Sequence, residues 1–260
     1  MILVAGGDSF IWGSELQDCL HAGPNGHSHN TFTALLAQQY DLDYVCAAYP
    51  GNSNSAIARS IMTACERFES QDKFVIVSWT FPHRFEFRFM HNDNSGESSW
   101  HSINSWQADG TLDKDYGEKI NSKEVCNFAK IFFNSVANNE YYEQYFYLKE
   151  ILFLQLYLKN KNIPYLFTTA HNESYQHINY DRHASDKDLN SLYNQIDWHN
   201  WYFFPGGKGA DQTESPRGFY QWAVESKYKI APQKHPIEDA HKDAAELIKE
   251  KFNEVVKEYL

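Results

Sequence analysis

The residues best suited to chemistry in this chain lie near its two ends. An apolar run, Met1–Ala5, stops at the sequence Gly-Gly-Asp-Ser (residues 6–9), which is the layout of a nucleophile turn at the end of a buried strand. The glycines permit positive φ angles and close backbone approach, so the Ser9 hydroxyl is left exposed. A serine hydroxyl needs a base within hydrogen-bond reach, and His235 is available in the last part of the chain. The alternative for Ser9 is a turn residue that caps the next helix.

Apolar runs alternate with helical patterns along much of the chain. Short apolar or β-branched runs predict strands, and amphipathic stretches predict helices. The expected strands cover 1–5, 43–47, 74–78 and 164–169, and the expected helices cover 31–40, 55–68, 141–158 and 236–260. This alternation predicts a mostly parallel sheet that is covered by helices on both faces.

Two long segments, 85–138 and 171–225, interrupt this pattern. They are rich in Asn, Ser, Asp, Gly and aromatic residues and show little clean periodicity. Each follows an expected strand, so both should emerge at the carboxyl edge of the sheet, where open α/β folds bind ligands. Insertions of this length are more often lids or binding walls than linkers. Because no repeat or linker divides the chain, we expect a single domain over 1–260.

Three short blocks together resemble the SGNH (GDSL-like) hydrolase family. They are Gly7-Asp8-Ser9-Phe10, Pro50-Gly51-Asn52-Ser53-Asn54, and His235-Pro236 ahead of an alanine-rich last helix. The match looks closest to a divergent branch found in marine bacteria and their phages, and a phage-encoded copy could be virion-associated. The resemblance implies a flavodoxin-like three-layer α/β/α sandwich with about five parallel strands. It also implies an esterase or acyl hydrolase activity that needs no cofactor.

The resemblance assigns roles to the matching residues. Ser9 would be the nucleophile, and His235 would shuttle its proton. The N–H groups of Ser9 and Gly51 would hold the oxyanion, and a Cβ at position 51 would block the approaching carbonyl. Gly51 follows a proline, so an ordinary turn glycine is the alternative there. Asp8, beside the nucleophile, is a further candidate site residue.

The chain departs from the family pattern after the third expected strand. The family places there a Gly-x-Asn block whose asparagine donates to the oxyanion, whereas this chain reads Trp-Thr-Phe-Pro-His-Arg over 79–84. Asn54 or Asn52 could supply the donor, or either could form an Asx turn or cap the following helix. Arg84 could stabilise negative charge or bind a substrate carboxylate, or it could pair with Glu86 or another acid.

A second departure concerns the acid that orients the histidine. The family pattern puts an aspartate three residues before the histidine, and this chain has Pro232 there. Orientation of His235 would then come from a backbone carbonyl, from Gln233, or from a distant acid such as Asp211. Losing the acid need not abolish catalysis, because the acid mainly fixes the tautomer and steadies the imidazolium. His241, inside the last helix, is the rival base.

Composition limits the partners that the chain could have. A formal charge of −11 without a compensating basic block argues against nucleic acid or an anionic membrane surface. Four scattered cysteines indicate reduced thiols, and no apolar run is long enough to span a membrane or serve as a secretory signal. We therefore expect a cytoplasmic protein. The 12 histidines show no familiar metal-ligand spacing, so no metal site is expected.

Two hypotheses for the function follow. The first is a serine esterase or carbohydrate O-deacetylase. It would act on a small-molecule or glycan ester through an acyl-Ser9 intermediate. The second is a catalytically weak or inactive SGNH-like module that binds glycans or another partner. The aromatic residues of the insertions bear on both hypotheses. Exposed rings suit sugars or aryl esters, whereas buried rings would form a mini-core that holds the insertions together.

Overall fold

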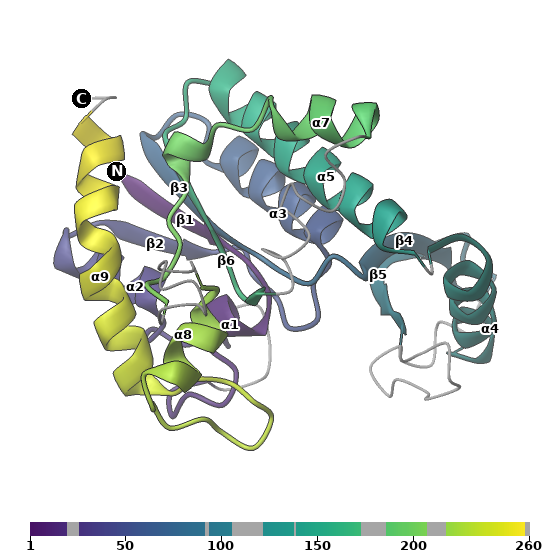
Figure 1. Cartoon of the computed structure of the whole chain (residues 1–260), viewed down its shortest axis with the longest axis horizontal. Coiled ribbons are helices and arrows are strands. Elements are labelled where there is room, and N and C mark those ends of the chain that lie inside the picture. Colours follow the sequence, from purple (N-terminus) through teal and green to yellow (C-terminus); the bar gives the residue numbers. More distant parts are fainter. Residues whose placement is uncertain are drawn as a thin grey trace.

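A computed structural model of the chain has a parallel β-sheet at its centre (Figure 1). The structure describes residues 1–19, 26–91, 94–105, 122–137, 139–172, 186–206 and 217–257. Within these ranges the central sheet has four strands in the order β2-β1-β3-β6. They are β1 (Ile2–Gly6), β2 (Asp43–Cys46), β3 (Lys73–Trp79) and β6 (Tyr165–Thr169). Every residue of β1, β3 and β6 is buried, as expected for strands that are covered on both faces.

Helices cover both faces of this sheet, which confirms the predicted three-layer α/β/α architecture. Alternate strand residues point to opposite faces, so each face has its own apolar core. One face is covered by α1 (Ser9–Trp12), α2 (Phe32–Gln39), α8 (Phe219–Glu225) and α9 (Glu238–Lys257). The other face is covered by α3 (Asn54–Arg67), α5 (Glu140–Asn160) and α7 (Lys187–Tyr193).

Side-chain caps explain where several of these helices begin. Thr31 caps α2, Ser53 caps α3 and Asn139 caps α5, and each accepts a backbone N–H of the first helical turn. These polar residues stand directly before amphipathic sequence, which is why the expected helix starts agree with the observed ones to within one or two residues.

The described sheet has four parallel strands where about five are expected. The place of a fifth is taken by a single parallel bridge, in which Trp201 pairs with Phe167 of β6. The Tyr202 N–H donates to the Phe167 carbonyl over 2.8 Å at this bridge. With the bridge included, the strand order is the 2-1-3-4-5 pattern of flavodoxin-like sheets, which bind ligands beyond the carboxyl ends of the strands. Ser9 lies at that edge because it follows β1 directly.

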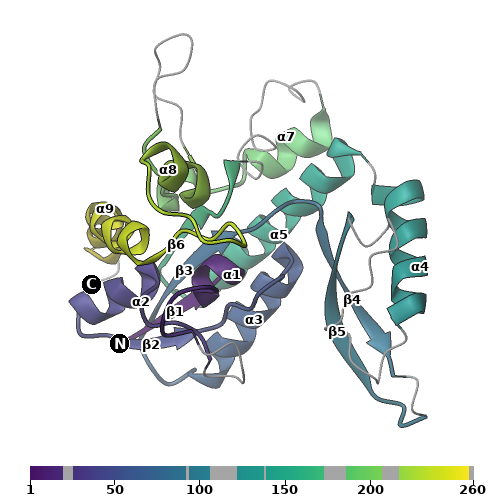
Figure 2. The ribbon, with the colours of Figure 1, turned by 90° about the horizontal axis from the view of Figure 1, so that it is seen from below.

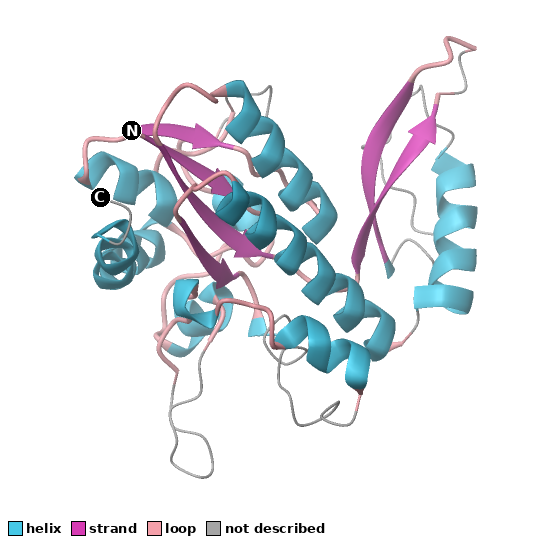
Figure 3. Cartoon of the chain, turned by 90° about the horizontal axis from the view of Figure 1, so that it is seen from above, coloured by secondary structure: helices cyan, strands magenta, loops and turns pink. Residues whose placement is uncertain are grey.

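The first insertion is more regular than its composition suggests. It contains an antiparallel hairpin of β4 (Arg84–Met90) and β5 (Ser98–Asn104), then α4 (Ser122–Phe132) and a π-helical segment over Phe133–Ala137. We call β4, β5 and α4 the hairpin unit, and Figures 2 and 3 show it to one side of the central sheet. Phe85 and Phe87 pack toward α4 and build a small apolar core there.

Within the described residues, the aromatic side chains of the second insertion belong to the main cores rather than to a separate mini-core. Trp201 is 5% exposed and lies in the core beside α5, whereas Phe204 is fully buried in the core beside α9. Trp100, from the first insertion, is 46% exposed. Most of the insertion rings in the described residues are therefore explained by packing.

The described residues contain no helix that is both long and apolar enough to cross a membrane. The four cysteines, Cys19, Cys46, Cys65 and Cys126, form no disulfide in the described part of the chain. Desolvation raises the pKa of Cys46 and of Cys65 to about 11, so these thiols remain protonated near neutral pH.

Candidate active site

The turn after β1 makes Ser9 the first residue of the short helix α1. Asp8 caps this helix, and its Oδ1 accepts the Phe10 N–H over 3.1 Å. Gly7 has no room for a side chain, because a Cβ there would lie 2.5 Å from the Ile11 side chain. Asp8 is fully buried, whereas Ser9 is partly exposed. The turn therefore holds its acid inside the protein and presents the hydroxyl at the surface.

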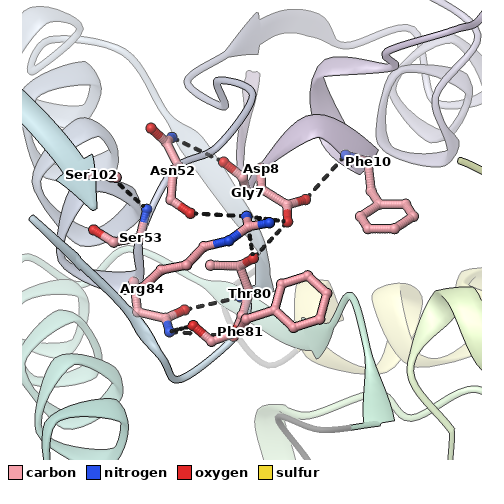
Figure 4. Close-up of polar contacts among 10 residues, drawn as sticks. Gly7, Asp8, Phe10, Asn52, Ser53, Thr80, Phe81, Arg84 and Ser102 are labelled. Atoms are coloured by element: carbon pink, nitrogen blue, oxygen red, sulfur yellow. Dashed lines mark hydrogen bonds and ion pairs between the residues drawn. The ribbon is translucent and has the colours of Figure 1, made fainter. Parts of the chain in front are cut away.

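The loop that follows β3 holds the buried Asp8 carboxylate (Figure 4). Asp8 Oδ2 accepts from Thr80 Oγ1 at 2.6 Å and from Arg84 Nη1 at 3.1 Å. Arg84 Nη1 also donates to the Asn52 carbonyl over 3.3 Å, so one guanidinium links three loops at the sheet edge. Of the roles considered for Arg84, an ion pair with an acid other than Glu86 is the one observed.

The loop after β2 brings Gly51 and Asn52 to the same edge. Gly51 has a φ of +78°, a left-handed conformation that favours glycine, and nothing lies within 4 Å of the place a Cβ would take. The Asn52 side chain donates to the Gly7 carbonyl over 3.1 Å, which ties this loop to the nucleophile turn. Among the described residues, the N–H groups of Ser9 and Gly51 have no hydrogen-bond acceptor. Both are therefore available to a bound oxyanion.

The Asn54 amide has acceptors within the protein. Asn54 is 3% exposed, and its Nδ2 donates to the carbonyls of Thr80 and Phe81 over 3.3 and 3.2 Å. Its Oδ1 accepts the Thr80 N–H over 2.9 Å. The side chain expected to serve the oxyanion instead fixes the loop after β3. Neither asparagine caps α3, because Ser53 does so through its hydroxyl.

His235 lies on a tight turn just before α9. Residues 230 and 236 form an antiparallel bridge, and the Ala231 N–H donates to the His235 carbonyl over 2.8 Å. Lys234 completes the turn in a left-handed conformation with a φ of 68°. This turn holds the imidazole against the Phe10 ring, with 5.3 Å between the ring centroids. Because Phe10 follows Ser9, the imidazole lies beside the nucleophile turn.

The Ser9 hydroxyl itself forms no hydrogen bond of 3.5 Å or less with His235 or with any other described residue. Catalytic hydrogen bonds are often long when a site is empty of substrate and shorten in the reacting complex. The structure thus brings Ser9 and His235 to one edge of the sheet without joining them directly.

The partner of the His235 ring is Glu15, a residue missed at the sequence level. Glu15 Oε2 lies 2.7 Å from His235 Nδ1, and the two side chains are only 15% and 12% exposed. Burial of the carboxylate opposes its ionisation, but hydrogen bonds from the His235 ring and the Gln233 N–H outweigh this and lower the pKa of Glu15. Of the partners expected for His235, Gln233 donates its N–H to Glu15, and Asp211 lies outside the described residues.

The rival base, His241, lies in the apolar core. It is 1% exposed, and its Nδ1 accepts the Phe32 N–H over 3.1 Å. Its ring packs against Phe219, with 4.7 Å between the ring centroids. Burial lowers the pKa of His241 to about 3, so the ring stays neutral and holds the start of α2. His241 therefore has a structural role that explains its position.

Partly exposed rings extend from Phe10 around one side of the site. The series consists of Phe10, Tyr220, His171 and Phe81, with successive centroid separations of 6.2, 5.5 and 4.9 Å. We call the last three the ring wall. The Arg84 guanidinium lies 4.7 Å from the centre of the Phe81 ring and pairs with Asp8. The series begins at Phe10, which follows Ser9 in the chain, and ends at Phe81, which is linked to Asp8 through Arg84.

No protein-family model matches this chain, and no curated protein is similar to it in sequence. Among solved structures, the psychrotrophic esterase EstA from Pseudoalteromonas sp. aligns with 99% of this chain and 97% of its own, at 12% identity and a TM-score of 0.42. The acetyl xylan esterase Est2A from the rumen bacterium Butyrivibrio proteoclasticus aligns over 99% of this chain and 64% of its own, at 14% identity and a TM-score of 0.42. The acetyl xylan esterase AlAXEase aligns over 98% of this chain and 85% of its own, at 10% identity and a TM-score of 0.32. All three are distant in sequence and in structure.

The site combines groups that suit acyl transfer. It has a partly exposed hydroxyl, an imidazole with a carboxylate partner, and two N–H groups that are open to an oxyanion. In the described part of the chain, no three His, Cys, Asp or Glu side chains gather as metal ligands would. The arrangement can support attack of the Ser9 hydroxyl on a carbonyl carbon, with the negative charge held by backbone donors.

Proposed function

We propose that this chain is a serine ester hydrolase that acts through an acyl-Ser9 intermediate. The observation that carries the proposal is the imidazole of His235, which has a carboxylate on Nδ1 and lies against the residue that follows Ser9. A hydrogen bond at Nδ1 leaves Nε2 free to take the serine proton. A histidine that served only for packing would not need a carboxylate hydrogen-bonded to its ring.

The reaction would proceed in two balanced halves. Ser9 Oγ attacks the ester carbonyl while His235 Nε2 takes the hydroxyl proton, and the tetrahedral intermediate then expels the alcohol, which receives that proton. Water next attacks the acyl-Ser9 ester, again giving its proton to His235. The proton returns to Ser9 Oγ as the carboxylic acid product departs. His235 therefore ends each cycle as it began.

The oxyanion would be held by the N–H groups of Ser9 and Gly51. We assign the third donor to Asn52 rather than Asn54, because Asn52 Nδ2 uses one hydrogen on the Gly7 carbonyl and retains a second. Both Asn54 Nδ2 acceptors are carbonyls of the protein. Removing one donor of this kind typically costs about 10²–10³-fold in kcat.

The ring wall supports an ester whose alcohol part is itself a ring. Flat, partly exposed rings that each keep a polar edge, such as His171 and Tyr220, can stack on a sugar or an aryl group. A short-chain ester of a sugar or a phenol is the substrate class that we propose. This class includes O-acetylated carbohydrates.

A serine-directed fluorophosphonate tests the proposal most directly. Wild-type protein should be labelled with one equivalent at Ser9, as identified by mass spectrometry of the labelled peptide. Ser9→Ala should lose labelling and lose at least about 10³-fold in kcat/KM on a short-chain aryl ester. Ser14→Ala changes a nearby serine that follows α1. It is the matched control and should keep both labelling and activity.

A different result would support the second function. Wild-type protein that resists labelling yet binds acetylated or plain glycans would behave as an inactive SGNH-like binding module. Ser9→Ala with wild-type esterase activity would remove Ser9 from the mechanism altogether.

A further inference from the structure

We propose that Glu15 is the positioning residue for His235, and that it replaces the acid which Pro232 removes from the segment before the histidine. The inference rests on the proposed function and deepens it. The acid would come from the loop that follows α1, the helix of the nucleophile, and not from the turn that carries the base.

The contact between the two side chains is short and sheltered. Glu15 Oε2 lies 2.7 Å from His235 Nδ1, which is the distance of a charge-assisted hydrogen bond. The Gln233 N–H lies 3.1 and 3.0 Å from the two carboxylate oxygens. One carboxylate therefore holds both the imidazole and the backbone of the turn that presents it, so its own rotation is restricted.

The backbone around Glu15 is held in an uncommon conformation. Glu15 has a φ of 68°, which is rare for a residue with a side chain and costs about 1 kcal/mol or more. Gly13 also has a positive φ, and the N–H groups of Gly13 and Ser14 both donate to the Ser9 carbonyl over 3.0 Å. The loop thus folds back from the nucleophile and directs the Glu15 carboxylate at His235. Such strain persists where surrounding contacts fix it, and here those contacts end on Ser9 and His235.

A second contact joins the same two loops and provides a comparison. The Gln17 N–H donates to Glu238 Oε1 over 2.8 Å, at the start of α9. Glu15 and Glu238 thus both connect the segment after α1 with the segment around the start of α9. Of these two carboxylates, Glu15 is the one that contacts a titratable ring. A purely structural role for Glu15 would make the two carboxylates equivalent in effect.

The chemistry of the contact assigns a specific task to Glu15. A carboxylate on Nδ1 fixes the tautomer with hydrogen at Nδ1, so the Nε2 lone pair is available to Ser9. It also stabilises the imidazolium that forms once the serine proton has moved. Losing the corresponding group in serine proteases lowers kcat by about 10⁴-fold through the wrong tautomer. We expect a loss of about 10²–10⁴-fold for Glu15→Gln.

The experiment compares three variants of the full chain. Glu15→Gln keeps the shape but not the charge, Glu15→Asp keeps the charge on a shorter side chain, and Glu238→Gln breaks the second contact only. Glu15→Gln should lower kcat about 10²–10⁴-fold with KM within about threefold, and Glu15→Asp should recover part of this loss. Glu238→Gln should stay within about threefold of wild type. Thermal unfolding of each variant shows that it remains folded.

Nitrogen-15 NMR of the imidazole provides a readout that does not depend on turnover. The His235 signals, assigned with His235→Asn, should report hydrogen at Nδ1 in wild type and a shift toward the Nε2 tautomer in Glu15→Gln. Unchanged kcat and an unchanged tautomer in Glu15→Gln would overturn the inference, as would an equal loss of kcat in Glu238→Gln. If wild type resists the fluorophosphonate but the tautomer still depends on Glu15, the proposed function fails while the pairing stands.

Discussion

The carboxyl edge of the sheet and the hairpin unit use different forces to hold loops and strands together. At the sheet edge, the Asp8 carboxylate, the Arg84 guanidinium and the Thr80 hydroxyl are buried or nearly so and bond to one another. In the hairpin unit, phenylalanine rings pack the hairpin against its neighbouring helices. The Phe85 ring by itself contacts the rings of Phe132, Phe133, Tyr142 and Phe146. The two regions meet at β4, which begins with Arg84 and continues with Phe85.

The difference explains why a catalytic site would lie at the sheet edge. Hydrogen bonds and ion pairs are directional, so they fix the position of Ser9 relative to its neighbouring loops. Ring packing is less directional and holds the hairpin against α4 without setting any one atom precisely in place. The cost of the directional network is sensitivity, because a buried charge that loses its partner is strongly destabilising.

The largest effect should come from removing the cation at the sheet edge. Arg84→Met leaves the fully buried Asp8 carboxylate without its guanidinium, and the free energy of unfolding should fall by about 4 kcal/mol. Guanidinium chloride unfolding followed by fluorescence measures this change.

The double variant Asp8→Asn with Arg84→Met distinguishes charge from packing. It leaves no unpaired charge, so it should be more stable than Arg84→Met alone. If the double variant is no more stable than the single one, the unpaired Asp8 charge is not what destabilises Arg84→Met. The loss then comes from the packing of the Arg84 side chain over Phe81, and the contrast between the two regions fails at this point.

A smaller and more local effect should follow from breaking the ring core of the hairpin unit. Phe85→Ala removes a 7% exposed ring, and the resulting cavity should cost about 3 kcal/mol. Hydrogen exchange should then accelerate in β5 and α4, while the amides of β1 and β3 keep their protection.

Met90→Ala is the matched control for this change. Met90 ends the same strand but is 61% exposed, so its loss should cost less than about 0.5 kcal/mol. Equal acceleration of exchange in β1 and in α4 after Phe85→Ala would mean that the hairpin unit and the sheet unfold as one body.

Local sequence signals account for most of what could be predicted about the fold. The expected strands at 43–47 and 74–78 match β2 and β3 to within one residue. For β3 the reason is that a strand buried on both faces needs an uninterrupted apolar run. β2, at the edge of the sheet, is only partly buried. The hairpin unit was not predicted, because its residues alternate between a small core and solvent among many polar side chains. Its rings make sense only once α4 is placed against them.

The candidate site divides in the same way. The turn that presents Ser9 depends on local sequence, so its glycines and its position after β1 can be predicted from the sequence. Glu15 was missed because its contact with His235 joins residues 220 positions apart and depends on a left-handed backbone at Glu15. Asn54 was expected at the oxyanion by proximity to Gly51, but the first turn of α3 directs its side chain to the loop after β3. Spacing identifies which residues are near a site but not where their side chains point.

The smallest predicted effect concerns His241, which lies in the core, in contrast to His235 at the sheet edge. His241 has a pKa of about 3 in the folded chain, against an ordinary value of 6.5. Between these values the unfolded chain binds a proton that the folded chain does not, so stability is lost as the pH falls below 6.5. This group alone should lower the free energy of unfolding by about 2 kcal/mol between pH 7 and pH 5.

His241→Asn isolates that contribution, because the asparagine carbonyl can still accept the Phe32 N–H but has no proton to gain. Denaturant unfolding at pH 7 and pH 5 should show a pH dependence about 2 kcal/mol smaller in the variant, whatever its stability at pH 7. His27, whose pKa burial also lowers, contributes equally to both proteins and cancels in the difference. The lowered pKa of Glu15 gives stability that is present above about pH 4.5 and lost below it, so it adds little in this window. An identical pH dependence in both proteins would show that His241 takes up its proton in the folded chain as it does in the unfolded chain. The contrast between a buried, neutral His241 and His235 at the sheet edge would then fail.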